Sequence, residues 1–103
     1  MPWLASLLML TLLMLTGATA QAEEARDVER LVRQDCGSCH GLTLKGGLGP
    51  AITPEAVAKY DDETLAEIIL DGVPDTPMPP WRALLGPGEL EAIIAYLRKG
   101  ESQ

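Results

Sequence analysis

The sequence predicts a small all-α domain, and three observations lead to this fold class. Apolar side chains recur at helical spacing in several segments, and no segment alternates apolar and polar side chains as a half-buried strand does. Glycine and proline punctuate the chain between these segments. After the uncharged N-terminal segment of 20 residues, the remaining residues 21–103 contain no Phe and a single Trp. The apolar core of such a domain is therefore small. We therefore expect short helices that need a further apolar group to complete their core.

The first helix is expected from Glu23 to about Asp35. Its apolar face consists of three side chains at helical spacing, Val28, Leu31 and Val32. Glycines and one proline then predict a loop from Gly41 to Pro50. This loop lacks the G-x-x-x-x-G-K-[ST] pattern, so it is not a phosphate-binding loop of that kind.

Two further helices are expected in the middle of the chain. Thr53 is suited to be an N-cap, and Pro54 at the first helical position supports a short helix to about Tyr60. Asp61 or Asp62 can cap the next helix, which Gly72 ends. The apolar face of this helix consists of Leu65, Ile68 and Ile69.

The last helix is expected between Gly86-Pro87-Gly88 and Gly100. Its apolar side chains follow the i, i+3, i+4, i+7 pattern and are Leu90, Ile93, Ile94 and Leu97. The segment before it, Val73–Pro80, is rich in proline, which fixes φ and prevents a helix.

The N-terminal residues 1–20 predict a cleaved secretory signal peptide. They carry no charged side chain, and Ala18-Thr19-Ala20 is a small-residue cleavage signature, with Ala20-Gln21-Ala22 as a second candidate. The alternative is an uncleaved membrane anchor, but the apolar run is shorter than the roughly 20 residues that a span needs. No cysteine lies near this site, which excludes a lipid anchor. We therefore expect residues 21–103 to form one exported, periplasmic domain without a stable membrane anchor.

All charged side chains lie in residues 21–103, where they give a formal net charge of −7. An acidic domain is a poor partner for nucleic acid and for anionic membrane surfaces, because like charges repel.

The motif Cys36-Gly37-Ser38-Cys39-His40 contains every cysteine and histidine of the chain. The C-x-x-C-H spacing is typical of covalent attachment of c-type haem. The two cysteines lie on one side of a helical turn and can each form a thioether with one haem vinyl group, while the histidine can bind the iron. Zinc needs four ligands, a thioredoxin-like pair needs a βαβ frame, and a structural disulfide leaves the histidine without a role. The motif therefore predicts one covalent haem held by Cys36 and Cys39, with His40 as an iron ligand.

Met78 is the predicted second iron ligand. It is the only methionine of residues 21–103, and prolines frame it in Thr76-Pro77-Met78-Pro79-Pro80-Trp81. Rigid prolines can hold one side chain in a defined place, and His/Met pairs are found in cytochromes c. Lys45, Lys59, the N-terminal amine and water are the alternatives. The second ring N–H of His40 should donate to a backbone carbonyl, for which Pro50 is the candidate.

The motif, Gly49-Pro50, the Met78 loop and the closing helix together resemble the small bacterial class I cytochromes c. The resemblance implies that Pro50 supports the haem histidine and that Met78 is the sixth ligand. In cytochromes c-551 an Asn usually follows Met-Pro-Pro, where this chain has Trp81. The stretches Cys36–Pro50 and Thr76–Trp81 more specifically resemble cytochrome c-55X, a family encoded with cytochrome cd1 nitrite reductase.

This resemblance implies a monomeric, non-enzymatic carrier of single electrons. Its expected partners are an upstream electron donor and cytochrome cd1 nitrite reductase, in denitrification. Two alternatives remain open, an accessory protein of haem d1 maturation and a ligand-binding or peroxidatic haem protein with a labile sixth site.

Overall fold

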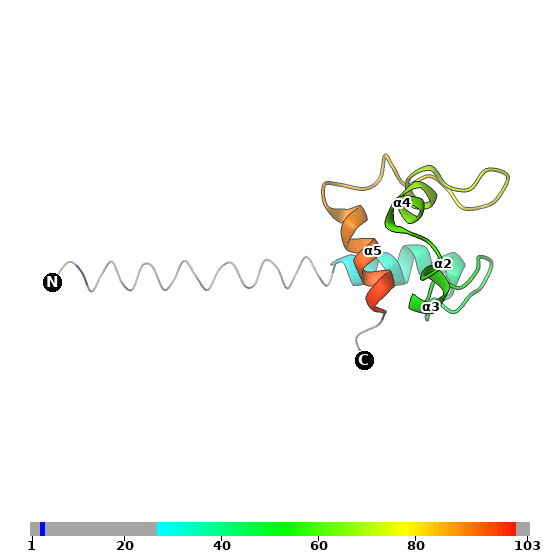
Figure 1. Cartoon of the computed structure of the whole chain (residues 1–103), viewed down its shortest axis with the longest axis horizontal. Helices are drawn as coiled ribbons and strands as arrows, with labels where there is room; N and C mark the ends of the chain where they lie inside the picture. The colour runs from blue at the N-terminus through cyan, green and yellow to red at the C-terminus, as the bar shows by residue number, and fades with distance from the viewer. Residues whose placement is uncertain (1–2, 4–26, 101–103) are drawn as a thin grey trace.

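The computed structural model describes residue 3 and residues 27–100. The predicted signal peptide, apart from residue 3, and its cleavage sites lie outside the described residues. Within the described residues, all regular secondary structure is helical (Figure 1), as the sequence predicts for the fold class. Residues 27–31 are α-helical and continue into η1 (Val32–Cys36), a π-helical segment, and α2 (Gly37–His40). They are followed by α3 (Pro54–Val57), α4 (Asp62–Asp71) and α5 (Glu89–Lys99).

The first helix extends further than the sequence predicts. It was expected to end near Asp35, but η1 and α2 carry it through the whole C-x-x-C-H motif. Within η1 the N–H of Gly37 donates to the carbonyl of Val32, which is the i→i+5 bond of a π-helix. The helix ends at Gly41, whose φ of +91° suits glycine. The motif therefore lies on the last turn of a helix.

The helix ends follow the local chemistry that the sequence predicts. The Thr53 hydroxyl accepts a hydrogen bond from the Ala56 N–H at 3.3 Å, and Asp61 caps α4 by accepting from the Thr64 N–H at 2.8 Å. Gly72 and Gly100 follow α4 and α5 with positive φ angles. The short helix α3 ends at Val57, earlier than the predicted Tyr60, because the chain turns there and the Tyr60 N–H donates to the Val57 carbonyl.

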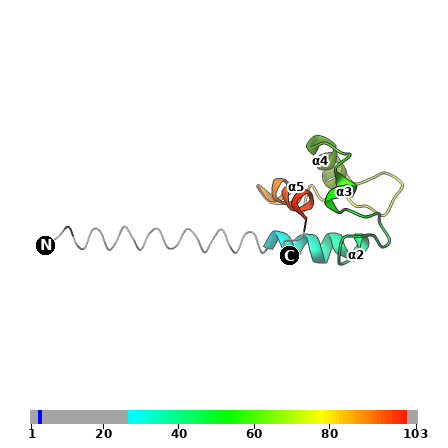
Figure 2. The ribbon, with the colours of Figure 1, turned by 60° about the horizontal axis from the view of Figure 1, so that its bottom comes forward.

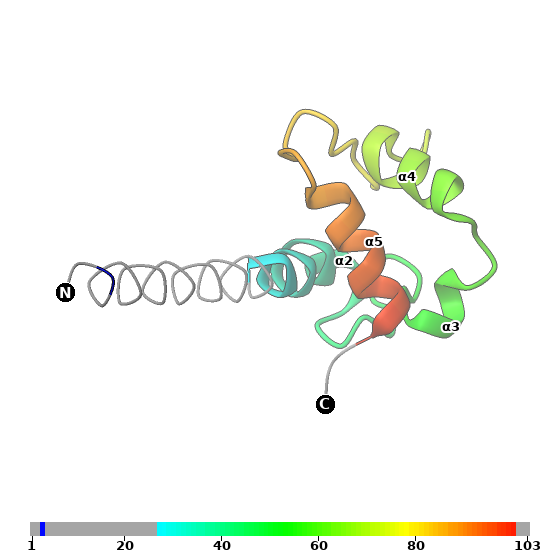
Figure 3. The ribbon, with the colours of Figure 1, turned by 60° about the vertical axis from the view of Figure 1, so that its left-hand side comes forward.

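The core is a single small aliphatic cluster beneath α5. α5 lies between the first helix and α4 (Figures 2 and 3), and it contacts both α3 and α4. Val32 is fully buried, and it shares the cluster with Leu44, Val57, Leu65, Ile93, Ile94 and Leu97. No aromatic side chain of the described residues is fully buried in this cluster. The core is as limited as the composition predicts.

Arg98 joins three elements at one point. Its guanidinium donates to the carbonyl of Tyr60 at 2.7 Å, to the carbonyl of Val57 at 3.4 Å and to Asp62 at 2.8 Å. α5 is thereby fixed to the end of α3 and the start of α4.

Within the described residues, no helix is both long and apolar enough to cross a membrane.

Candidate functional site

A cavity of about 640 Å³ opens between the C-x-x-C-H helix and the loop that follows α4. This loop, drawn in yellow in Figures 1 and 2, lies on the same side of the molecule as α2. The lining of the cavity is mostly apolar, and it includes Cys36, Cys39, His40, Pro50 and Met78. All five residues that the sequence singles out for the haem site therefore line one cavity.

Cys36 and Cys39 form no disulfide, and both line the same cavity. Burial, followed by the neighbouring Asp35 carboxylate, raises the pKa of the Cys36 thiol to about 11. Within the described residues there is no group of three or more His, Cys, Asp and Glu side chains that could hold a metal ion. A raised thiol pKa is the opposite of what a thioredoxin-like redox pair needs.

The His40 ring is oriented by a backbone carbonyl. Its Nδ1 lies 2.7 Å from the oxygen of Pro50. A carbonyl only accepts hydrogen bonds, so Nδ1 donates its proton to Pro50 and Nε2 is the ring nitrogen left to bind a metal. A neutral imidazole with one nitrogen fixed in this way is prepared to bind a metal through the other.

Glycines allow the loop after α2 to fold back against the motif. The amide of Gly46 donates to the His40 carbonyl at 2.8 Å, and the amide of Gly49 donates to the Cys39 carbonyl at 2.8 Å. A Cβ atom on Gly49 would lie 2.9 Å from Cε1 and 3.0 Å from Nδ1 of His40. The Gly49-Pro50 backbone can therefore approach the ring only because position 49 has no side chain.

The Met78 loop is fastened to the end of α4 at several points. Trp81 and Arg82 donate their amides to the carbonyls of Ile69 and Leu70 at 3.0 Å and 3.1 Å. The Arg82 guanidinium also pairs with Asp71 at 2.8 Å. These bonds bring both ends of the loop together and place Met78 on the wall of the cavity.

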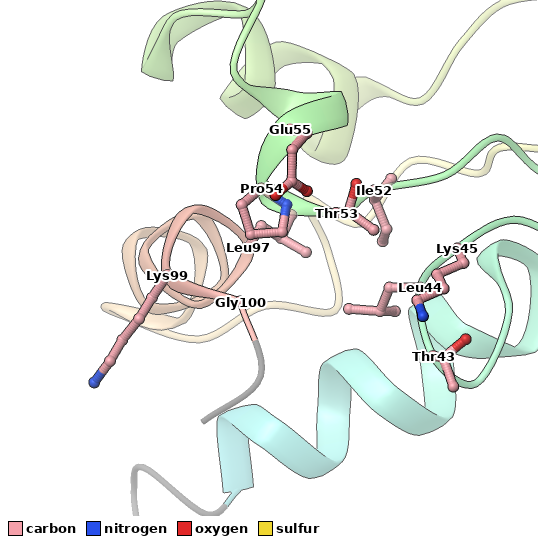
Figure 4. A pocket seen from close by; sticks show the side chains of 10 residues that line it. All are labelled: Thr43, Leu44, Lys45, Ile52, Thr53, Pro54, Glu55, Leu97, Lys99 and Gly100. Carbon is pink, nitrogen blue, oxygen red and sulfur yellow. The ribbon is translucent and has the colours of Figure 1, made fainter. Parts of the chain in front are cut away.

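Lys45 and Lys59, the alternative iron ligands, are not among the residues that line this cavity. Lys45 lines a smaller pocket of about 270 Å³ between the loop after α2 and the end of α5 (Figure 4). In that pocket the Leu44 side chain points toward α5, and Lys99 extends away from it. The Lys59 ammonium lies over the ring of Tyr60, 5.1 Å from its centroid. The N-terminal amine lies outside the described residues. Of the other candidates for the second iron ligand, Lys45, Lys59 and Met78, only Met78 lines the cavity.

Some residues of the cavity wall are not singled out by the sequence. Asp35 is such a residue, whereas Ser38 and Thr76 belong to the two motifs and Leu48 and Val73 to the loops next to them. Leu48 is 93% exposed, so it stands at the mouth of the cavity rather than in its depth. The Trp81 side chain also lines the cavity, at the place where cytochromes c-551 usually have Asn.

The residues present fit a haem. An apolar cavity suits a porphyrin, two thiols can react with its vinyl groups, and an imidazole nitrogen and a thioether are a known ligand pair for its iron.

Comparison with known proteins agrees with this fit. The chain is 48% identical over 98 residues to the cytochrome c55X of Paracoccus denitrificans, which covers 93% of this chain and 95% of that protein. The chain belongs to the cytochrome c55X family. A solved structure described as the c-type cytochrome NirC superposes with a TM-score of 0.71 at 48% identity, over 78% of this chain and 94% of that one. The chain therefore carries a covalently bound c-type haem with its iron and belongs to a family of electron carriers.

Two further similarities extend this family assignment. The family model described as cytochrome c oxidase, cbb3-type, subunit III matches residues 23–97, so the chain also belongs to that wider family. The dihydro-heme d1 dehydrogenase of Pseudomonas aeruginosa is 41% identical over 88 residues, which are 85% of this chain and 18% of that protein. A domain similar to this cytochrome is thus one part of a larger protein.

Proposed function

We propose that this c55X-family cytochrome is a monomeric periplasmic carrier of single electrons that donates them to cytochrome cd1 nitrite reductase. Cys36 and Cys39 attach its haem, and His40 and Met78 bind the iron from its two sides. Residues 1–20 act as the signal peptide that exports residues 21–103. The observation that carries the proposal is the single cavity on which both thiols, the imidazole and the thioether converge.

The bound haem supplies a reversible one-electron change of its iron, between Fe(III) and Fe(II). The chain supplies ligands for both axial positions, and a filled sixth position disfavours chemistry on a substrate. Pro50 orients the His40 ring through the 2.7 Å hydrogen bond that its carbonyl accepts from Nδ1. This arrangement supports electron transfer rather than catalysis by the chain itself.

The mouth of the cavity is the proposed surface for electron transfer. Apolar side chains dominate its lining, and they include Leu48, Val73, Pro77, Pro79 and Trp81. Among the described residues that line the cavity, Asp35 is the only Asp, Glu, Lys or Arg. Redox partners usually meet through small interfaces, below about 1,200 Å², and the acidic side chains elsewhere are screened beyond a Debye length of about 8 Å. We therefore expect an encounter that depends on apolar contact more than on charge.

Stopped-flow mixing of the reduced cytochrome with oxidised cytochrome cd1 nitrite reductase tests the proposal. We expect rapid electron transfer with a rate that changes little across a salt series. Leu48→Ala should slow the transfer because it removes apolar contact at the mouth, whereas Glu63→Gln on α4 serves as the control and should not. A steep fall in rate with salt would instead show a charge-driven encounter, and an absence of transfer would reject this partner.

A second candidate function is assistance in haem d1 maturation. It is favoured by the similarity to part of a dihydro-heme d1 dehydrogenase, where a domain like this one is joined to the rest of the protein. In that role the cytochrome would accept electrons from a separate maturation enzyme. Transfer from such a dehydrogenase during turnover, together with no transfer to nitrite reductase, would favour this second function.

Binding of carbon monoxide to the reduced protein separates both carrier functions from a ligand-binding or peroxidatic one. An iron with both axial positions filled should bind carbon monoxide slowly. Fast binding would show a labile sixth position and would reject the carrier proposals.

A further inference from the structure

The backbone N–H of Met78 stands between residues that have no N–H of their own. Residues 77, 79 and 80 are prolines, which have no N–H, so within Pro77–Pro80 only Met78 can donate from the backbone. This N–H donates to the hydroxyl oxygen of Thr76 at 3.3 Å. The backbone of the proposed ligand is therefore bonded to one nearby side chain.

The Thr76 hydroxyl also bonds in the other direction along the chain. It donates to the carbonyl of Val73 at 2.7 Å, and this carbonyl also accepts from the Thr76 N–H at 3.2 Å. The Val73 N–H in turn donates to the carbonyl of Met78 at 3.3 Å. These four bonds form a closed Val73–Thr76–Met78 network in which both backbone polar groups of Met78 take part.

The remaining backbone of this segment has few alternatives. Val73 to Thr76 form a turn with Pro74 at its second position and Asp75 at its third, where φ is +63°, as in a type II turn. Gly72 packs so closely that a Cβ atom there would lie 2.6 Å from the Met78 carbonyl oxygen. The Thr76 hydroxyl is the part of the network that a substitution can remove without changing this backbone.

We propose that Thr76 is a positioning residue that holds the backbone of Met78 where its thioether reaches the cavity. This inference rests on the proposed binding of iron by Met78. In this role Thr76 acts through the backbone of Met78 and is not itself an iron ligand. It acts by linking Met78 to Val73, the residue at which the loop leaves α4 and Gly72.

The test uses the matured haem protein and imidazole as a competitor for the sixth position of the ferric iron. Thr76→Val keeps the shape of the side chain and removes both hydroxyl bonds. We expect it to weaken the long-wavelength sulfur–iron absorption band and to raise the apparent affinity for imidazole about fivefold, as befits the loss of two exposed hydrogen bonds. Thr76→Ser keeps the hydroxyl and should stay within about twofold of the wild type.

Two further variants keep the test decisive. Thr76→Ala removes the hydroxyl without adding volume, and it replaces Thr76→Val if that variant retains less haem. Thr43→Val, in the loop after α2, changes a threonine that lines the smaller pocket and should leave the imidazole affinity unchanged.

The outcomes separate this inference from the proposed function. An absent sulfur–iron band in the wild type would overturn Met78 as the ligand, and the role of Thr76 with it. A normal band in the wild type with unchanged imidazole affinity in Thr76→Val and Thr76→Ala would overturn only the role of Thr76. Equal weakening in Thr76→Ser and Thr76→Val would also overturn it, because the hydroxyl would then not be the cause.

Discussion

Met78 is the proposed ligand whose replacement should change the state of the iron most. Met78→Ala should abolish the sulfur–iron band, lower the reduction potential and open the iron to added imidazole, because the proposed thioether ligand is lost. Visible spectra and a redox titration measure these changes. Leu48→Ala, at the mouth of the same cavity, is the control and should keep the band. An unchanged spectrum in Met78→Ala would point to Lys45, Lys59 or the terminal amine.

Gly37, inside the C-x-x-C-H motif, and Gly49, in the loop after it, should respond differently to replacement by alanine. Gly49→Ala forces a Cβ atom to within 2.9 Å of the His40 ring and should lower the free energy of unfolding by about 1–3 kcal/mol. Gly37 lies in α2 with φ of −62°, and a Cβ atom there would meet its nearest neighbours at 3.6 Å. Gly37→Ala should therefore be neutral or stabilise by up to about 1 kcal/mol. Urea unfolding of the two haem proteins measures the difference, and equal stabilities would contradict the proposed approach of Gly49 to the ring.

At the scale of the helices, Arg98 is the strongest single link. Arg98→Leu leaves the carbonyls of Val57 and Tyr60 and the Asp62 carboxylate without their shared donor. We expect a loss of about 2 kcal/mol in urea unfolding, since the arginine is only about one-third exposed. Arg82→Leu breaks a more exposed pair and should cost less than about 1 kcal/mol. A similar cost for both variants would show that Arg98 is no more than a surface ion pair.

The Asp61 cap of α4 predicts a pH dependence. Its hydrogen bonds with Thr64 lower the pKa of the Asp61 carboxyl, and the side-chain bond has the larger effect, followed by the backbone bond. Because the pKa is lower in the folded chain, the stabilisation is fully present above the ordinary aspartate pKa and is lost as the pH falls through the folded value. Asp61→Asn keeps an uncharged cap, so its thermal stability should fall less than that of the wild type below about pH 4. Parallel acid-induced losses in the two proteins would contradict this cause.

Helix positions were predictable where the signal is local. Thr53, Asp61, Gly72 and Gly100 mark the ends of helices through their own hydrogen bonds or dihedral angles, and the structure has all four in these roles. The sequence predicts a helical turn at the motif, but not that this turn continues the first helix, because the i→i+5 bond between Gly37 and Val32 has no sequence signature. The first helix ends at Gly41, where φ is positive.

The candidate site was predictable for residues with distinctive chemistry. Cys36, Cys39, His40 and Met78 are rare residue types in this chain, and Pro50 follows from the need of His40 for an acceptor. Asp35 was not predicted, because its place on the cavity wall depends on how the loop after α4 folds back toward α2. Such contacts between distant segments leave no pattern in the chain.

For the molecule as a whole, the small aliphatic core predicts that folding depends on the haem. Within the described residues, seven buried side chains form this core, and Cys36, which lines the 640 Å³ cavity, packs against it. Residues 21–103 produced without haem should therefore show little helical circular dichroism, because the cavity would expose apolar surface to water. The matured protein is the control. A well-folded haem-free chain would show that the aliphatic core suffices.

The most direct measurement of the central claim is acid–organic extraction of haem from the matured protein. Thioether bonds through Cys36 and Cys39 should keep the haem on the polypeptide, and each single Cys→Ser variant should keep it through the other bond. The double variant should release it. The account is contradicted if haem leaves the wild-type chain freely and both thiols then react with an alkylating agent.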